Sequence, residues 1–250
     1  MFYGLPEREL VTLLEELLAL RRAHGADVPA GAALGPHPVL AATGLDGAFA
    51  QGLRARLLDH LGEARIERFT ERNHQIPARD RWDFYLFDRS GDEPVRAEIA
   101  TTATDEQQVT GTPDLPGAVG GVAAIAPPLD SPVVAVVDEL RPAEVTDAIR
   151  AGFARAVELE DPGRHTSESI DCVSCHLAES ARQLGATTYG LTTTTAFHSA
   201  RSLAYQRDRA VVTNLHLFAY VGRAVAVSQR VANESAVAAD AFERLLRAAR

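Results

Sequence analysis

The chain has 250 residues, 46% of them hydrophobic, so it can bury a sizeable core. Its formal net charge is -9 with no long run of one sign, which argues against nucleic acid as a partner, because such proteins need a basic face to neutralise phosphates. All 25 basic residues are arginine, so a lysine nucleophile, a Schiff-base lysine and a P-loop lysine are excluded.

The first half of the chain predicts helices followed by strands. Leucines recur at helical spacing from Leu5 to Arg22 with Gly25 as a stop, a Gly-, Ala- and Pro-rich loop follows over residues 26–38, and a second helix is predicted from Asp46 to Leu61. The residue pattern then alternates between apolar and polar, which predicts an antiparallel meander. Its strands are Arg65–Glu71, Trp82–Asp88 and Val95–Thr102, with a turn at Ser90–Asp92. The aromatic residues around Trp82 are expected to build the core face of this sheet.

The second half of the chain begins with a segment rich in proline and glycine. It predicts, in order, a long loop over Thr110–Ser131, a strand over Pro132–Val137, a helix from Arg141 to Leu159, a short helix over Leu177–Leu184 stopped by Gly185, a loop or edge strand over Thr187–Thr195, a strand over Val211–Val221 and a closing helix over Asn233–Ala249. Asn233 is expected to cap the closing helix.

Together these elements predict an α+β fold in which helices flank an antiparallel sheet. We expect a single domain over residues 1–250, within which residues 1–140 could form a scaffold and residues 141–250 a second part. No apolar run approaches the ~20 residues that cross a bilayer, so an integral membrane protein is not expected.

The strongest chemical signal is the sequence Asp171-Cys172-Val173-Ser174-Cys175-His176, which holds both cysteines of the chain. Cys-x-x-Cys-His is the order used for covalent haem attachment, in which both thiols form thioethers and the following imidazole binds iron. Three alternatives remain open. The cysteines could form a disulfide, they could bind zinc together with a distant histidine, or the spacing could be chance.

The motif resembles the attachment site of c-type cytochromes, over the stretch Cys172–His176. The resemblance implies one covalent haem c, carried by Cys172 and Cys175, with His176 as the proximal iron ligand. These cytochromes use a downstream methionine as the sixth ligand, but the one methionine here is Met1. The sixth position is then left to a histidine, to water or to no ligand. The candidate histidines are His165 and His198, with His216 further downstream.

The chain is also loosely similar to uncharacterised exported proteins of myxobacteria that carry one such motif in a larger α+β domain. The matching stretches are 165–176 and 227–235. This similarity implies a periplasmic, cell-surface or secreted protein whose signal peptide has been removed, with a possible lipid anchor upstream. If Met1 is the native start, a cytoplasmic location is expected instead, and with it a zinc-stabilised protein.

The expected function is that of a monohaem c-type cytochrome-like protein, which binds haem and transfers electrons outside the cytoplasm. We expect an electron carrier rather than an enzyme, because no polar acid/base pair suited to a haem peroxidase can be identified. The alternative is a structural or interaction domain with a Cys172–Cys175 disulfide, or a zinc-binding protein. Nothing in the sequence identifies the redox partner.

Overall fold

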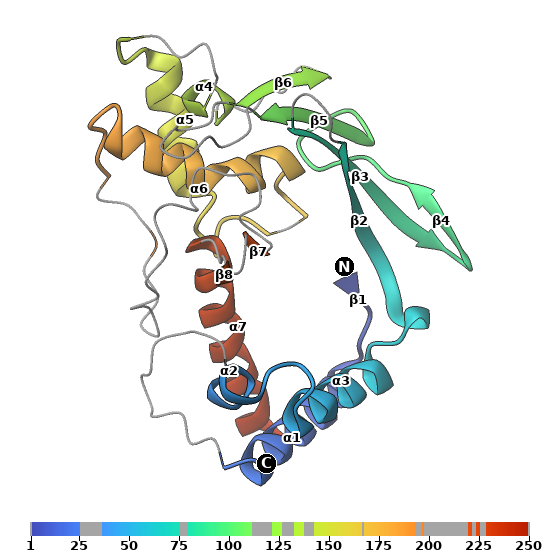
Figure 1. The fold of residues 1–250 in the computed structure, drawn as a ribbon. Helices are drawn as coiled ribbons and strands as arrows, with labels where there is room; N and C mark the ends of the chain where they lie inside the picture. Colours follow the sequence, from blue (N-terminus) through green and yellow to red (C-terminus); the bar gives the residue numbers. More distant parts are fainter. Residues whose placement is uncertain are drawn as a thin grey trace. The chain divides into compact units, whose positions relative to one another are not determined.

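The computed structural model describes residues 2–25, 37–75, 80–111, 122–126, 133–137, 143–166, 168–193, 197, 220–221, 224–225 and 229–249. It confirms the predicted α+β class, with an antiparallel sheet and flanking helices (Figure 1). The helices are α1 (Glu7–Ala23), α2 (Pro38–Thr43), α3 (Ala48–His60), α4 (Val134–Val137), α5 (Asp147–Glu158), α6 (Cys172–Thr187) and α7 (Gln229–Ala248). The strands are β1 (Phe2–Tyr3), β2 (Ile66–Gln75), β3 (Asp80–Ser90), β4 (Glu93–Arg96), β5 (Glu106–Gly111), β6 (Val122–Ala126), β7 (Tyr220–Val221) and β8 (Ala224–Val225).

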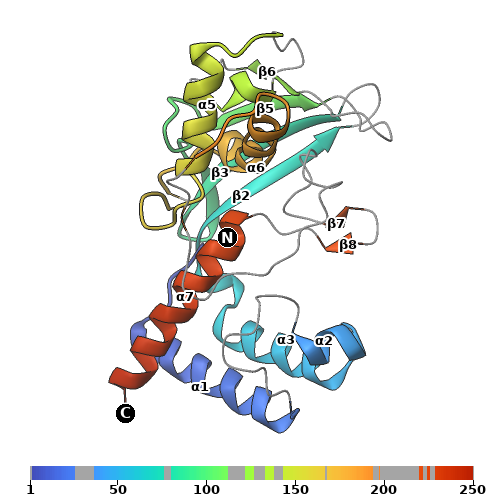
Figure 2. The same ribbon diagram turned by 90° about the vertical axis from the view of Figure 1, so that its left-hand side faces the viewer.

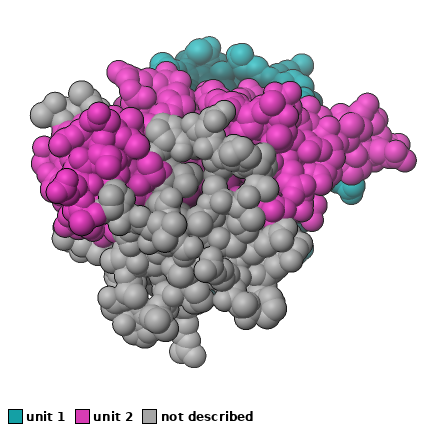
Figure 3. Space-filling model, turned by 90° about the horizontal axis from the view of Figure 1, so that it is seen from above, with its two compact units in different colours: residues 1–69, 199–205, 235–250 teal, residues 70–198, 206–234 magenta. Residues whose placement is uncertain are grey.

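The chain divides into two compact units, which are coloured separately in Figure 3. Unit 1 comprises residues 1–69, 199–205 and 235–250, and unit 2 comprises residues 70–198 and 206–234. The division therefore falls within β2 and within α7. The single domain expected from the sequence, with its possible boundary at residue 140, stays a prediction.

Unit 1 contains the two leucine-rich helices that the sequence predicted. α1 packs against α3, and the apolar side chains Leu13, Leu20 and Phe49 of these helices are buried. The start of β2 pairs with β1 in antiparallel register, Tyr3 opposite Ile66. Both predicted helices are thus confirmed to within two residues at each end.

Unit 2 holds most of the sheet, in the order β2-β3-β5-β6, with β4 paired to the far end of β3. β3 pairs in antiparallel fashion with β4 and β5, and β5 does so with β6. The predicted turn between β3 and β4 is confirmed, with Gly91 at a φ of 67°. The third predicted strand, Val95–Thr102, was largely wrong, because β4 begins at Glu93 and ends at Arg96. Beyond it the chain folds back on itself: Ile99 N donates to Thr104 O, and Thr101 takes a φ of 63°.

The helices α4, α5 and α6 pack together and against the sheet, where α6 contacts β5 and α4 contacts β6 (Figures 1 and 2). The core of unit 2 lies among these helices and includes Phe84 of β3, as the aromatic pattern of that strand predicted. The other fully buried side chains in it include Val133, Val136, Ala156, Leu159, Val173, Leu177 and Leu184.

Three predictions for the middle of the chain were wrong. The expected loop over Thr110–Ser131 contains the end of β5 and all of β6. The expected strand over Pro132–Val137 contains the helix α4, because packing against α5 and α6 overrides the β preference of valine. The helix expected from Arg141 begins at Asp147, where the side chain of Thr146 accepts a hydrogen bond from Ile149 N at 3.2 Å and caps it.

The closing helix also begins earlier than predicted. α7 starts at Gln229, so Asn233 is an interior residue and its predicted capping role is wrong. Its amide donates instead to the carbonyl oxygen of Glu160 at 2.8 Å. Thr187–Thr193 contains no strand, and most of the predicted strand Val211–Val221 lies outside the described residues.

Candidate functional site

The cysteine motif forms the first turn of α6 rather than a loop before a helix. The sequence placed the helix start at Leu177, five residues too late. The reason is Asp171, whose carboxylate accepts a hydrogen bond from Ser174 N at 2.8 Å and so satisfies a donor that the helix start leaves open. An aspartate directly before the motif is an N-cap signal that could have placed the start correctly.

The two thiols and the imidazole lie on one face of α6. Cys172, Cys175 and His176 occupy helix positions i, i+3 and i+4, which are neighbours on a helical surface. A different face of the helix is apolar and buried in the core of unit 2; it carries Val173, Leu177, Ala181 and Leu184. Burial of that face fixes which way the motif is turned.

A buried polar network ties the start of α6 to the sheet. Gln107 of β5 is fully buried, and its Nε2 donates to Asp171 Oδ2 at 3.1 Å while its Oε1 accepts from Val173 N at 3.2 Å. Thr101 Oγ1 also donates to Asp171, at 3.4 Å. Asp171 therefore takes three hydrogen bonds from three separate parts of unit 2. No local signal in the sequence marks Gln107 for this role.

The ring of His176 lies against the ring of Phe84 on β3. Their centroids are 4.9 Å apart and the planes meet at 47°, a tilted aromatic contact. Phe84 is itself buried, with 3% of its surface exposed. The contact orients one side of the imidazole while the side chain as a whole stays half-buried.

Both cysteines are half-buried, and they are not joined by a disulfide. Burial, and to a smaller extent the carboxylate of Asp171, raise the pKa of the Cys172 thiol from 9.0 to about 12. Burial likewise raises the pKa of Cys175 to about 11, against the opposing charge of Arg230. A helix N-terminus normally favours the thiolate. Here desolvation outweighs that effect, so both thiols are protonated at neutral pH.

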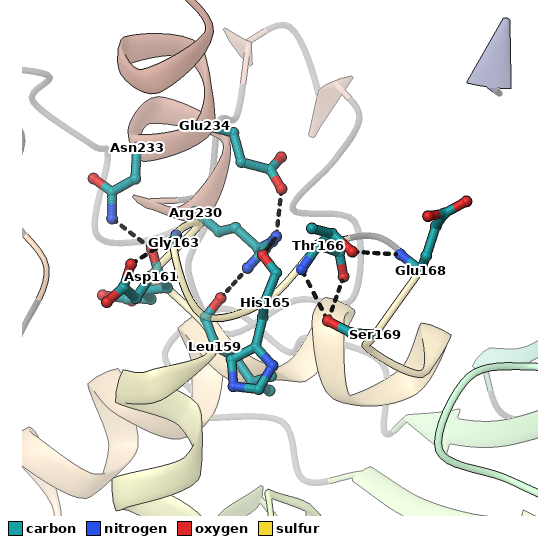
Figure 4. A network of polar contacts seen from close by, with 11 residues as sticks. Leu159, Asp161, Gly163, His165, Thr166, Glu168, Ser169, Arg230, Asn233 and Glu234 are labelled. Carbon is teal, nitrogen blue, oxygen red and sulfur yellow. Dashed lines mark hydrogen bonds and ion pairs between the residues drawn. The ribbon is translucent and has the colours of Figure 1, made fainter. Parts of the chain in front are cut away.

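The loop that leads into the motif is held by the start of α7 (Figure 4). Arg230 is 4% exposed, and its guanidinium donates to the carbonyl oxygens of Leu159 and His165, the second at 2.8 Å, and pairs with Glu234. A second contact joins α7 to α6 itself, where Gln229 N donates to Glu179 Oε2 at 3.0 Å. Sequence reasoning missed Arg230, since an arginine at a helix start is ordinarily solvated.

His165 is engaged with Arg155 of α5 at its Nε2, 2.9 Å from the guanidinium. Because arginine only donates, Nε2 must be the acceptor, and its lone pair is in use. Burial, followed by the charges of Arg155 and Arg230, lowers the pKa of His165 and favours the neutral ring. The other candidate histidines, His198 and His216, lie outside the described residues.

Within the described ranges, no three His, Cys, Asp or Glu side chains are grouped so that they could hold a metal ion. A zinc site at the motif therefore gains no support from this part of the chain. The same ranges contain no helix that combines the length and apolar character needed to cross a bilayer. No protein-family model, curated protein or solved structure matches the chain.

Proposed function

We propose that the chain is a monohaem c-type cytochrome-like protein that binds haem and transfers electrons outside the cytoplasm. In this proposal Cys172 and Cys175 carry the haem through thioether bonds and His176 is the proximal iron ligand. Haem, when bound, would supply a one-electron iron couple whose potential depends on the axial ligands and on burial.

The observation that carries the proposal is the shared face of Cys172, Cys175 and His176 on the first turn of α6. Covalent attachment needs both thiols and the imidazole on the same side of the chain, and helix positions i, i+3 and i+4 supply that. A loop with the same five residues would not fix their relative positions. The donor set therefore fits haem in both chemistry and spacing.

The state of the thiols agrees with this assignment. With pKa values of about 12 and about 11, Cys172 and Cys175 are poor thiolate nucleophiles at neutral pH, which argues against a thioredoxin-like redox pair. Thioether formation needs no stable thiolate in the folded protein, because each sulfur ends as an uncharged link.

The proposal also includes a location for the protein and a sixth iron ligand, both of which follow from haem chemistry. Thioether attachment takes place outside the cytosol, so the protein would be periplasmic, at the cell surface or secreted, with or without a lipid anchor. The sixth position would be taken by His165 or His198. If it is His165, Arg155 must release Nε2 when iron binds, since one lone pair cannot serve both.

The proposal is tested by exporting the chain to a periplasm that has haem-attachment machinery. We expect the intact mass to increase by one haem and a sharp α band to appear on reduction. The Cys172→Ser and Cys175→Ser double variant should gain no covalent haem. His176→Ala, which removes the proximal imidazole, should lose the spectrum of a low-spin iron.

An unmodified mass, or a loss of two hydrogens only, would contradict the proposal. The loss of two hydrogens would favour the Cys172–Cys175 disulfide in a structural or interaction domain. Stoichiometric zinc on unmodified protein would favour the metal alternative. Arg247→Ala, on an exposed part of α7, is a matched control that should leave the mass gain unchanged.

A further inference from the structure

Two residues on neighbouring strands face the start of α6 together. Phe84 of β3 and Gln107 of β5 are directly opposite each other in the antiparallel ladder, so their side chains point to the same face of the sheet. Phe84 contacts the imidazole of His176, and Gln107 binds the backbone and cap of the turn that carries Cys172. One cross-strand pair thus reaches both ends of the motif.

We infer that Phe84 and Gln107 are the positioning residues of the motif: Gln107 fixes the backbone of its first turn, and Phe84 fixes the orientation of the imidazole. The inference rests on the proposed function, because it assigns these residues to the alignment of the haem-attaching and iron-ligating side chains. We assign both residues a positioning role and not a catalytic one.

Gln107 is suited to the backbone role because it binds in two directions at once. Its Oε1 accepts from Val173 N at 3.2 Å, while its Nε2 donates at 3.1 Å to the same Asp171 oxygen that caps Ser174 N. The side chain is fully buried, so water cannot replace these bonds without opening the turn. Replacement of Gln107 therefore removes two hydrogen bonds at the start of α6, one to Val173 N and one to Asp171.

Phe84 is suited to the ring role because its own position is fixed. It is 3% exposed and belongs to the core of unit 2, so it presents a rigid surface to the imidazole at 4.9 Å. Groups packed around a metal-bound imidazole fix its ring orientation, and the hydrophobic shell of the site affects the redox potential of the metal. A bulky side chain without a ring would fill the space and lose the tilted contact.

The first test uses the protein without haem, so that it does not depend on the proposed function. Gln107→Met, which keeps the volume but not the hydrogen bonds, should raise the rate of alkylation of the two thiols by iodoacetamide about tenfold, a factor equivalent to about 1.4 kcal/mol. Phe84→Leu should shift the NMR signals of the His176 ring protons through loss of the neighbouring ring current. It should change thiol alkylation less than Gln107→Met does.

Matched controls lie next to each residue. Gln108→Met changes a side chain that bonds to Glu106 and not to the motif, and Phe87→Leu changes a ring that contacts Arg96. Both should leave alkylation and the His176 signals as in the parent. Far-UV circular dichroism checks folding, and Phe84→Met replaces Phe84→Leu if the latter unfolds.

The second test uses the haem-loaded protein. Phe84→Leu should shift the midpoint potential and the low-spin spectrum, whereas Phe87→Leu, which changes a half-buried ring on the same strand, should not. Unchanged His176 signals in Phe84→Leu together with parental alkylation in Gln107→Met would overturn the inference. A parent that gains no haem would overturn the proposed function alone, because the measurements without haem would still decide the role of the pair.

Discussion

Arg230 Nη2 donates to the carbonyl oxygen of His165 at 2.8 Å and so links the first turn of α7 to the loop that leads into the cysteine motif. The two residues are 65 positions apart in the sequence. The same guanidinium also donates to the carbonyl oxygen of Leu159, the residue directly after α5, so one buried side chain binds two carbonyl oxygens of the segment between α5 and α6. This tertiary contact adds to the loop's own hydrogen bonds, among them that from Gly163 N to Asp161 Oδ1 at 2.8 Å.

This link predicts that Arg230→Met destabilises the protein by about 2–4 kcal/mol, because two carbonyl oxygens lose a charged donor. Arg230→Lys should recover only part of the loss, since an ammonium does not match the fork of the guanidinium. Urea unfolding followed by circular dichroism measures both. Arg247→Met, an exposed arginine of α7, is the control and should change stability by less than about 0.5 kcal/mol.

The close packing of Gly185 in α6 predicts that a larger residue there destabilises the protein. A Cβ at this position would lie 2.2 Å from Phe153 Cδ2, closer than any real contact. Gly185→Ala should therefore destabilise by about 1–3 kcal/mol, although alanine is the better helix former by about 1 kcal/mol. Thermal unfolding checks this. The double variant Gly185→Ala/Phe153→Leu should be more stable than the sum of the single changes, and strict additivity would contradict the steric explanation.

Stability should fall in alkaline solution because of the thiols. Their pKa values are about 12 and about 11 in the folded protein and 9.0 without burial, so the unfolded chain loses protons that the folded chain keeps. The free energy of unfolding should be highest below pH 9 and should decrease as the pH rises from 9 toward 11. Urea midpoints across this range test it in reduced, haem-free protein. In the Cys172→Ser/Cys175→Ser variant, the alkaline decrease should be smaller.

The lowered pKa of His165 predicts that the free energy of unfolding also decreases in acid. Its pKa is lowered by burial and by Arg155, so below pH 6.5 the unfolded chain binds a proton that the folded chain does not. Its contribution to stability is present above pH 6.5 and is lost as the pH falls toward the folded pKa. His165→Gln, which cannot be protonated, should flatten this part of the stability curve. An unchanged slope would rule out His165 as its source.

Several features could be predicted from the sequence because their causes are local. The leucine spacing of residues 7–23 predicted α1, the alternation of β3 predicted a strand with a buried Phe84, and Gly91 predicted the turn that follows. The Cys172, Cys175 and His176 pattern likewise needs only sequence spacing. Its function as a haem site stays a prediction.

Other features depended on partners distant in the chain. The valine-rich segment 133–137 forms helix α4, because its packing against α5 and α6 outweighs the β preference of valine. Asn233 moved from a cap to the interior of α7 and bonds to Glu160 O, a contact that spans 73 residues. Spacing along the chain carries no information about such pairs.

By itself the sequence determined which chemistry is available here: two thiols and an imidazole at fixed spacing, with arginine as the single long-chain cation. The tertiary structure decided how that chemistry is held. It supplied Gln107 and Phe84 from the sheet and Arg230 from α7, and it raised the pKa of both thiols by burying them. Burial and long-range hydrogen bonds arise only when distant segments pack, so their effect on the site follows from the fold alone.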